Sequence, residues 1–356
     1  MFQRKCSLLN ALMAVGLTVL SGLIAQAQTS YSYRDLGTLG GTSSSAAAVN
    51  NAGQVVGAST LANGEQHGFY WSPGTGMIDI FILGGTASTS QASGINNLGD
   101  IVGSITNSSV TLWHAFLWNS TTGIRTDLNS LLSPADASIW VLSFAKFVND
   151  NRQVIGYGSA TIGGTYYAQR SYMLDLRTNT FTDLGVTGAT AWAHAVNASS
   201  QVIGSISGVA YLYSGGSLTS LAPLYGGKSI NNAGASVGYL QNSDAAYYSP
   251  TGVVTDLGHL GTGIASASAN SINNAASPVL VGDSLVLIKN SNIHHAFRWI
   301  AGSGAIQDLN NLTPNLGKKI LLGATCVSDT GYIACQQDPS GINGTANTRA
   351  YLLTPQ

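Results

Sequence analysis

The segment VNNAGQVVG at residues 49–57 decides the fold, because the chain repeats it. It returns as INNLGDIVG at 95–103, VNDNRQVIG at 148–156, VNASSQVIG at 196–204 and INNAGASVG at 230–238. A looser copy, INNAASPVLVG at 272–282, and a divergent one, VSDTGYIAC at 327–335, bring the total to seven. Self-similarity at a period of about 20–50 residues is the signature of a repeat architecture.

Two further segments accompany each copy. An aromatic segment follows it, as HGFYW at 67–71, HAFLW at 114–118, RSYML at 170–174, AYLY at 210–213, AAYY at 245–248, HAFRW at 295–299 and RAYLL at 349–353. Most units then end on a segment of xDL type, as IDI at 78–80, TDL at 126–128, TDL at 182–184, TSL at 219–221, TDL at 255–257 and QDL at 307–309. Short runs rich in Val, Ile and aromatic residues, bounded by Gly, Asn and Ser, indicate strands. Each unit therefore predicts four strands, the first rich in Ala and Ser.

Four strands in about 47 residues match one blade of a β-propeller. We therefore predict an all-β protein, a single β-propeller of seven four-stranded blades, with six or eight blades as alternatives. A β-solenoid is disfavoured because its rungs are usually shorter and more regular. The motif asparagines are spaced unevenly, by 46, 53, 48, 34 and 42 residues, at Asn50, Asn96, Asn149, Asn197, Asn231 and Asn273.

The two ends of the chain predict how the ring closes. RDLG at 34–37 resembles a fourth strand with no first three strands before it, and the last unit, 321–353, has no xDL segment. We expect residues 31–37 to complete the last blade, which removes two exposed sheet edges.

Composition excludes several classes of protein. Only 8% of the 356 residues are charged, and 14 Lys and Arg balance 15 Asp and Glu to a net charge of −1. Such a chain has no general field for nucleic acid or an anionic membrane. It also lacks the strong charge that keeps disordered chains expanded. We expect a monomer with no nucleic-acid partner.

The start of the chain has the pattern of a signal peptide. Residues 1–27 have Arg4 and Lys5, an apolar run at 7–24 and a small-x-small site that ends at Ala27. We expect cleavage after Ala27 and a mature propeller, 28–356, that is secreted or periplasmic; an uncleaved anchor is the alternative. No second apolar run is long enough to span a bilayer.

Cys326 and Cys335 are the only cysteines after residue 27. An even number in an exported chain indicates a disulfide. A turn centred between Thr330 and Gly331 would place the two cysteines opposite one another, at a separation that a disulfide can bridge. A three-residue turn with a bulge would instead pair Cys326 with Ala334.

The combination of LGTLGG at 36–41, INNLGDIVG and HAFLW resembles the HAF-repeat family of bacterial extracellular proteins. The His-Ala-Phe segment occurs at 114–116 and 295–297, and as His-Gly-Phe at 67–69, whereas units three, four, five and seven lack the histidine. The resemblance implies export and a repeated β-structure. It brings no settled activity or ligand.

The recurring histidines His67, His114 and His295 favour a structural role, bonded to a strand carbonyl or to the xDL aspartate, since a residue that recurs with the fold usually serves the fold. His194, His259 and His294 lie off the motif but have no metal-ligand spacing such as HExxH. The xDL aspartates are expected to cap turns. No motif predicts catalytic residues, a metal or a cofactor.

Two functions remain open. The first is a binding or scaffold module for an extracellular glycan, surface polymer or peptide, with off-pattern aromatics as candidate ligand-binding residues: Trp113, Tyr166, Tyr167 and Trp192. Packing between blades is an equal alternative for these four. The second is an exported polysaccharide hydrolase or lyase. Two off-motif carboxylates within about 10 Å in one pocket would favour the enzyme, whereas an uncharged aromatic mouth would favour binding.

Overall fold

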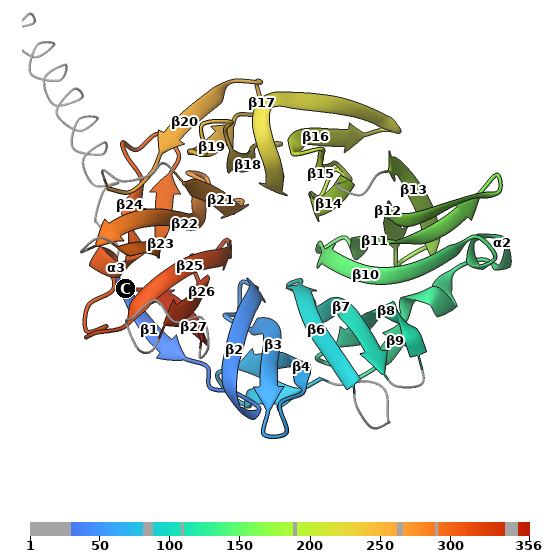
Figure 1. Cartoon of the computed structure of the whole chain (residues 1–356), viewed down its shortest axis with the longest axis horizontal. Helices are drawn as coiled ribbons and strands as arrows, with labels where there is room; N and C mark the ends of the chain where they lie inside the picture. The colour runs from blue at the N-terminus through green and yellow to red at the C-terminus, as the bar shows by residue number, and fades with distance from the viewer. Residues whose placement is uncertain are drawn as a thin grey trace, which may run out of the picture.

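Seven antiparallel blades surround a central axis in the computed structural model of the chain (Figure 1). The structure describes residues 30–80, 88–107, 110–187, 191–261, 266–288, 291–338 and 348–356. The predicted signal peptide, 1–27, lies outside the described residues. The predicted all-β propeller of seven blades is confirmed.

The strand that precedes the repeated turn is innermost in each blade, and the following strands lie successively further out. The strands of blades one to three are β2 (Gly40–Val49), β3 (Val55–Leu61), β4 (Gln66–Ser72) and β5 (Gly76–Asp79); β6 (Ser88–Ile95), β7 (Asp100–Asn107), β8 (Val110–Asn119) and β9 (Arg125–Asp127); and β10 (Trp140–Val148), β11 (Gln153–Ile162), β12 (Thr165–Asp175) and β13 (Thr180–Thr187). Blade six contains β21 (Ala267–Ile272), β22 (Val279–Ile288), β23 (Ser291–Ile300) and β24 (Gln307–Asp308). Short helical turns follow the outer strands of blades two and six: η2 (Leu128–Leu131), α2 (Pro134–Ala137) and α3 (Leu309–Leu312).

Blades four and five share one strand. β17 (Ser217–Ile230) pairs near its start with β16 (Val209–Ser214) and near its end with β18 (Ser236–Tyr239). The two blades therefore form one seven-stranded sheet, which also holds β14 (Ala191–Val196), β15 (Val202–Ile206), β19 (Ala245–Tyr248) and β20 (Val254–Gly258). This sharing explains why the motif asparagines of blades four and five, Asn197 and Asn231, are only 34 residues apart.

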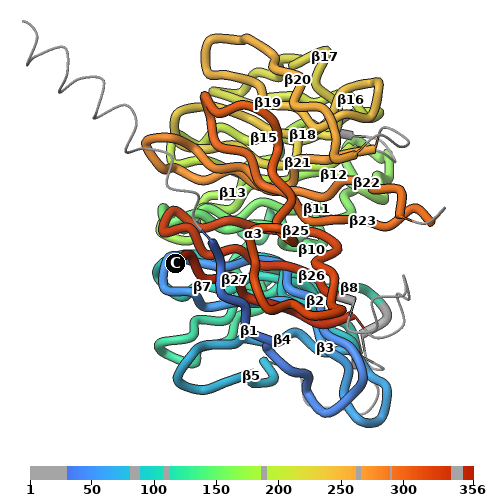
Figure 2. Tube along the Cα trace, turned by 90° about the vertical axis from the view of Figure 1, so that its left-hand side faces the viewer, coloured from blue at the N-terminus to red at the C-terminus, as the bar shows by residue number. Residues whose placement is uncertain are grey.

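The last blade combines both ends of the described chain, as predicted. β1 (Tyr31–Asp35) pairs antiparallel with β27 (Arg349–Pro355), outside β26 (Ile333–Asp338) and β25 (Ile320–Val327) (Figure 2). Tyr31 and Leu36 are 3% and 4% exposed, so the closing segment contributes side chains to the core as well as a ladder.

The glycine at the end of the repeated segment allows a close approach between strands. A Cβ added at Gly103 would collide with the carbonyl oxygen of Gln91 and would lie 2.8 Å from the ring of Phe116. The inner strand bulges beside this glycine, and the fully buried aromatic residue of the third strand covers it. The same collision recurs at four other glycines: Gly57, Gly156, Gly204 and Gly282. Cores form between blades, as in the cluster that joins Val56 and Tyr70 of blade one to Phe116 and Trp118 of blade two.

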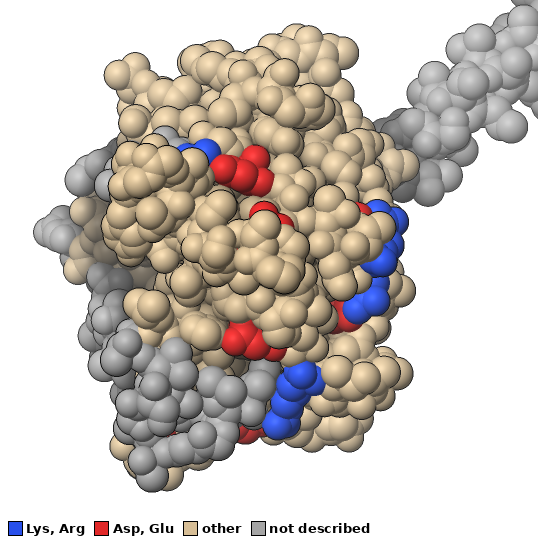
Figure 3. All heavy atoms as spheres, turned by 90° about the vertical axis from the view of Figure 1, so that its right-hand side faces the viewer, with Lys and Arg blue, Asp and Glu red and all other residues tan. Residues whose placement is uncertain are grey.

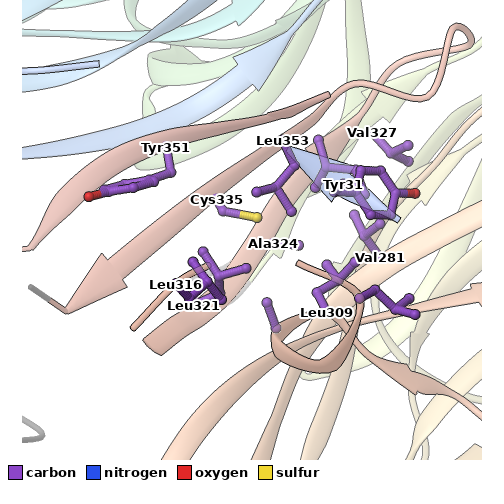
Figure 4. Close-up of a cluster of buried hydrophobic side chains, with 13 residues drawn as sticks. Tyr31, Val281, Leu309, Leu316, Leu321, Ala324, Val327, Cys335, Tyr351 and Leu353 are labelled. Carbon is purple, nitrogen blue, oxygen red and sulfur yellow. The ribbon is translucent and has the colours of Figure 1, made fainter. Parts of the chain in front are cut away.

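The predicted Cys326–Cys335 register is wrong, and both thiols are free. The turn holds five residues, 328–332, because Ser328 Oγ accepts the amide of Tyr332 at 3.1 Å. Cys326 therefore faces Ala334, and a bulge after Ala324 sets Cys335 opposite Ala324. The Cys335 thiol lies among Leu353, Leu321 and Ala324 (Figure 4). Burial raises the pKa of both thiols, so they remain protonated and react poorly.

Candidate functional site at the channel mouth

The motif asparagines close one end of the central channel. Asn50 Oδ1 accepts the amides of Ala52 and Gln54 at 3.1 and 3.0 Å, and its Nδ2 donates to Gln54 Oε1 and to the carbonyl of Asn96 in the next blade. The amide group is thus used at all four positions. The bond to the carbonyl of the following blade recurs, at 3.0–3.3 Å, from Asn96, Asn149, Asn197, Asn231 and Asn273. These six residues join neighbouring blades around the axis.

A second set of bonds follows the same circle, one residue further on. The backbone amide of Asn51 donates to Asn97 Oδ1, and the backbone amide of Asn97 donates to Asp150 Oδ1. The circle returns to blade one where Asp329 N donates to Asn51 Oδ1 at 2.8 Å. The turns of all seven blades leave only a cavity of about 150 Å³ at this end. We call it the turn end of the channel.

The three HAF histidines lie against the aspartates of their own blades, one of the two structural alternatives expected. His67, His114 and His295 place Nδ1 at 2.7, 2.7 and 2.8 Å from the xDL carboxylates of Asp79, Asp127 and Asp308. In blades two and six, the other carboxylate oxygen accepts the backbone amide two residues further on, which caps the turn. Arginine replaces histidine in blade three, where Arg170 pairs with Asp183, and in blade seven, where Arg349 lies 3.5 Å from Asp35.

Blade five reverses this arrangement. Asp244 precedes the AAYY segment, at the position where five of the other six blades have histidine or arginine, and His259 lies 2.6 Å from its carboxylate. Asn242 bridges Asp244 and the xDL residue Asp256. This cluster is a variant of the structural pair.

At the opposite end the channel widens into a cavity of about 590 Å³, which we call the mouth. Most of its lining residues come from the inner strands of blades one to five, at two positions that lie three and five residues before the motif asparagine, and Ala58, Ser205 and Tyr239 of the second strands also line it. In blades one and two these positions hold small or polar residues, Ser45, Ala47, Gln91 and Ser93. In blades three to five they hold Lys146, Trp192, His194, Gly226 and Lys228.

A continuous series of aromatic rings reaches the mouth from blade two. Trp113 stacks on Phe144 with 5.2 Å between ring centroids, and Phe144 stacks on Tyr157 at 4.7 Å. Tyr157 then contacts the edge of Trp192 at 4.8 Å. All four rings are half-buried, so each keeps some surface open to solvent. We call this series the aromatic ladder.

The mouth is basic, not uncharged. Lys146 and Lys228 make no ion pair with any described residue, although Lys146 Nζ lies 5.7 Å from the ring centre of Tyr157. Burial lowers the pKa of Lys146. Burial and the charges of Lys228 and Lys146 lower the pKa of His194 to about 4, so this histidine is neutral at physiological pH.

The four aromatic residues predicted as ligand-binding candidates therefore fall into two pairs, one connected with the mouth and one outside it. Trp192 lines the mouth, and Trp113 reaches it through the ladder. Tyr166 is 66% exposed on the outer hairpin of blade three, and Tyr167 lies 5.1 Å from the guanidinium of Arg170. Neither tyrosine lines the mouth. Sequence reasoning missed Phe144, Tyr157 and the two lysines, although the lysines stand at a fixed distance before the motif asparagine.

Within the described part of the chain, no three His, Cys, Asp or Glu side chains gather as a metal site. In the same residues, no helix has the length and hydropathy needed to cross a membrane. The face shown in Figure 3 carries few acidic and basic groups, in line with the 8% of charged residues in the sequence.

We expect His194 to make the protein less stable in acid. Between about pH 6.5 and pH 4 the unfolded chain binds a proton at this residue and the folded protein does not, so acidification lowers the free energy of unfolding. The loss should be about 1–3 kcal/mol. Urea unfolding at pH 7 and pH 4.5 measures it, with His194→Ser, which copies Ser93 of blade two, as the control. An equal loss in both proteins would contradict the prediction.

Solved structures place the chain among the β-propellers. It matches oligogalacturonate lyase from Vibrio parahaemolyticus with a TM-score of 0.52 and 9% identity, over 91% of this chain and 97% of that one. It matches the WD40 propeller domain of Doa1 with a TM-score of 0.50 and 11% identity, over 90% and 97%. Acylaminoacyl peptidase from Pyrococcus horikoshii gives 0.52 and 10%, over 90% of this chain and 53% of that one. At such identities these likenesses establish only the fold.

No protein-family model matches the sequence, and no curated protein matches it. The fold itself defines the class of the protein: it is a seven-bladed β-propeller that is closed by an N-terminal strand.

Proposed function

We propose that this protein is an exported, non-catalytic binding module of the HAF-repeat type, whose mouth holds a segment of an extracellular glycan. The observation that carries the proposal is the aromatic ladder, which ends at Trp192 inside a cavity of about 590 Å³. Concave sites lined by aromatic rings with a few polar groups are typical of ligand binding. Half-exposed rings offer flat apolar faces on which sugar rings can stack.

The distribution of carboxylates supports binding over hydrolysis. A glycosidase needs two carboxyl groups that face one another across about 5–10 Å. No Asp or Glu is among the residues that line the mouth. Three of the off-motif acids are engaged elsewhere: Asp100 with Arg152, Asp175 with Arg177, and Asp244 with His259.

Trp192→Ala tests the proposal in the mature protein on a panel of soluble glycans and peptides. We expect the wild type to retain at least one glycan, and Trp192→Ala to weaken that binding at least about tenfold, since a stacked ring contributes of the order of 1–3 kcal/mol. Tyr166→Ala, which removes an exposed ring away from the mouth, is the matched control and should bind normally.

Ala47→Trp covers the case in which Trp192→Ala fails to fold, because it narrows the mouth from blade one without removing a ladder ring. It should also abolish binding. Retention of no glycan by the wild type, or equal binding by the mouth variants, would overturn the proposal. Release of new reducing ends or unsaturated products from a bound glycan would overturn its non-catalytic part.

A further inference from the structure

Two lysines that form no ion pair with a described residue line the mouth, one in blade three and one in blade five. Lys146, His194 and Lys228 occupy the same position of the repeat in blades three, four and five, three residues before the motif asparagine or its turn. In the other blades this position holds Ala47, Ser93, Asn270 and Thr325, which are small or neutral. The fold therefore does not require a cation here, and the two lysines are a property of this mouth.

The carboxylates of the chain do not neutralise these lysines. Of the 15 acidic residues, every one but Asp338 has a described side chain, and none of those side chains lines the mouth. Asp283 of blade six stands at the repeat position that corresponds to the lining residue Ser205 of blade four. Asn270 and His294 hold its carboxylate at 2.8 and 3.0 Å. In a chain with only 8% charged residues, two unpaired lysines in one cavity are a marked concentration of positive charge.

The pKa shifts of the groups that line the mouth have the sign expected where cations lie close together without a counter-charge. Burying an ammonium group without a counter-ion is unfavourable. The lowered pKa values of Lys146 and His194 have this cause in part, since each is desolvated and His194 also feels both lysines. An anion between the lysines would remove that repulsion.

We propose that the mouth binds acidic glycans, with Lys146 and Lys228 as the groups that hold a carboxylate or sulfate while the aromatic ladder stacks on the sugar ring. This deepens the proposed function and depends on it. Stacking and charge are offered within one cavity, because Trp192 and Lys146 both line it and Lys146 lies over Tyr157, a ladder ring. A sugar that carries an acidic group supplies both features within one ring, which favours it over an acidic peptide.

The experiment compares polymers that differ only in charge. The mature protein is titrated with dextran sulfate and dextran, and with alginate and its propylene glycol ester; poly-glutamate represents an acidic peptide. We expect an acidic glycan to bind at least tenfold more tightly than its neutral counterpart, with affinity that falls as salt is added. The two pairs separate sulfate from carboxylate as the preferred group.

The variants copy residues found at the same position in other blades, so they should fold. Lys146→Thr copies Thr325, and Lys228→Asn copies Asn270. Each should weaken acidic-glycan binding about tenfold, and the double variant about a hundredfold. Lys318→Thr removes an exposed lysine outside the mouth and is the matched control. In addition, a bound polyanion should raise the pKa of His194 in an NMR titration, and a merely structural role of the lysines would leave it unchanged.

The outcomes are distinguishable. Equal binding of charged and neutral polymers, lost in Trp192→Ala but kept in both lysine variants, would overturn the acidic-glycan proposal and leave the binding proposal intact. Equal binding of poly-glutamate, unaffected by Trp192→Ala, would assign the site to acidic peptides and overturn both. No binding by any polymer would overturn both.

Discussion

Gly103→Ala should destabilise the protein by at least about 3 kcal/mol, although it adds a single methyl group. The new Cβ would occupy the space of the Gln91 carbonyl oxygen and would lie 2.8 Å from the Phe116 ring. A backbone carbonyl on the inner strand cannot move aside without breaking the bulge that places it there. Urea unfolding of the purified variant measures the loss.

Gly74→Ala is the matched control for this substitution. Gly74 has nothing within 4 Å of an added Cβ, and its φ needs no glycine, so the change should alter the free energy of unfolding by no more than about 1 kcal/mol. A Gly103→Ala protein as stable as Gly74→Ala would show that the inner strand yields easily. The interpretation of the repeated glycine would then be wrong.

Removal of the closing strand should have a still larger effect. A chain that begins at residue 38 lacks β1, and with it the burial of Tyr31 and Leu36 and the ladder to β27. Each side chain contributes about 1.5–3 kcal/mol by burial, so with the ladder bonds we expect a loss of about 5 kcal/mol or more. Arg298 also loses its contact with Tyr31 Oη at 3.0 Å.

Hydrogen exchange locates this loss. Gln356 N donates to Ser30 O, so by the alternation of an antiparallel ladder the amides of Leu352 and Thr354 also point toward β1. These amides should exchange rapidly in the truncated protein, whereas the amide of Leu353 faces β26 and should stay protected. Adding a peptide of residues 28–37 should restore protection, and a scrambled peptide should not. Unchanged protection without β1 would contradict the closure.

Most of the fold could be predicted from the repeat, because the residue types of most strands reflect their place in the blade. Alanine and serine at 43–49 predicted an inner strand, and RDLG at 34–37 predicted the closing one. The cysteine register was not predictable in the same way. It depends on a five-residue turn and a bulge, which arise from side-chain-to-backbone bonds such as Ser328 to Tyr332.

The site was only half predictable. Trp113 and Trp192 stood out as aromatics off the repeat pattern, but so did Tyr166 and Tyr167, which lie outside the mouth. The informative signal was positional. Reading the residue three before each motif asparagine gives alanine, serine, lysine, histidine, lysine and asparagine in blades one to six. Only the ring geometry shows that the first five of these residues, which belong to five different blades, line a single cavity.

The pairing of β1 with β27 also sets an order of events in folding. Ser32 and Thr354, which face one another, are 322 residues apart in the chain. During synthesis, β1 emerges before any other described strand and must wait with its edge unpaired until the last strand has appeared. Contacts of such long range slow folding, and unpaired edges invite aggregation. The ring can therefore close only after β27, the last described strand, has been synthesised and is free to pair with β1.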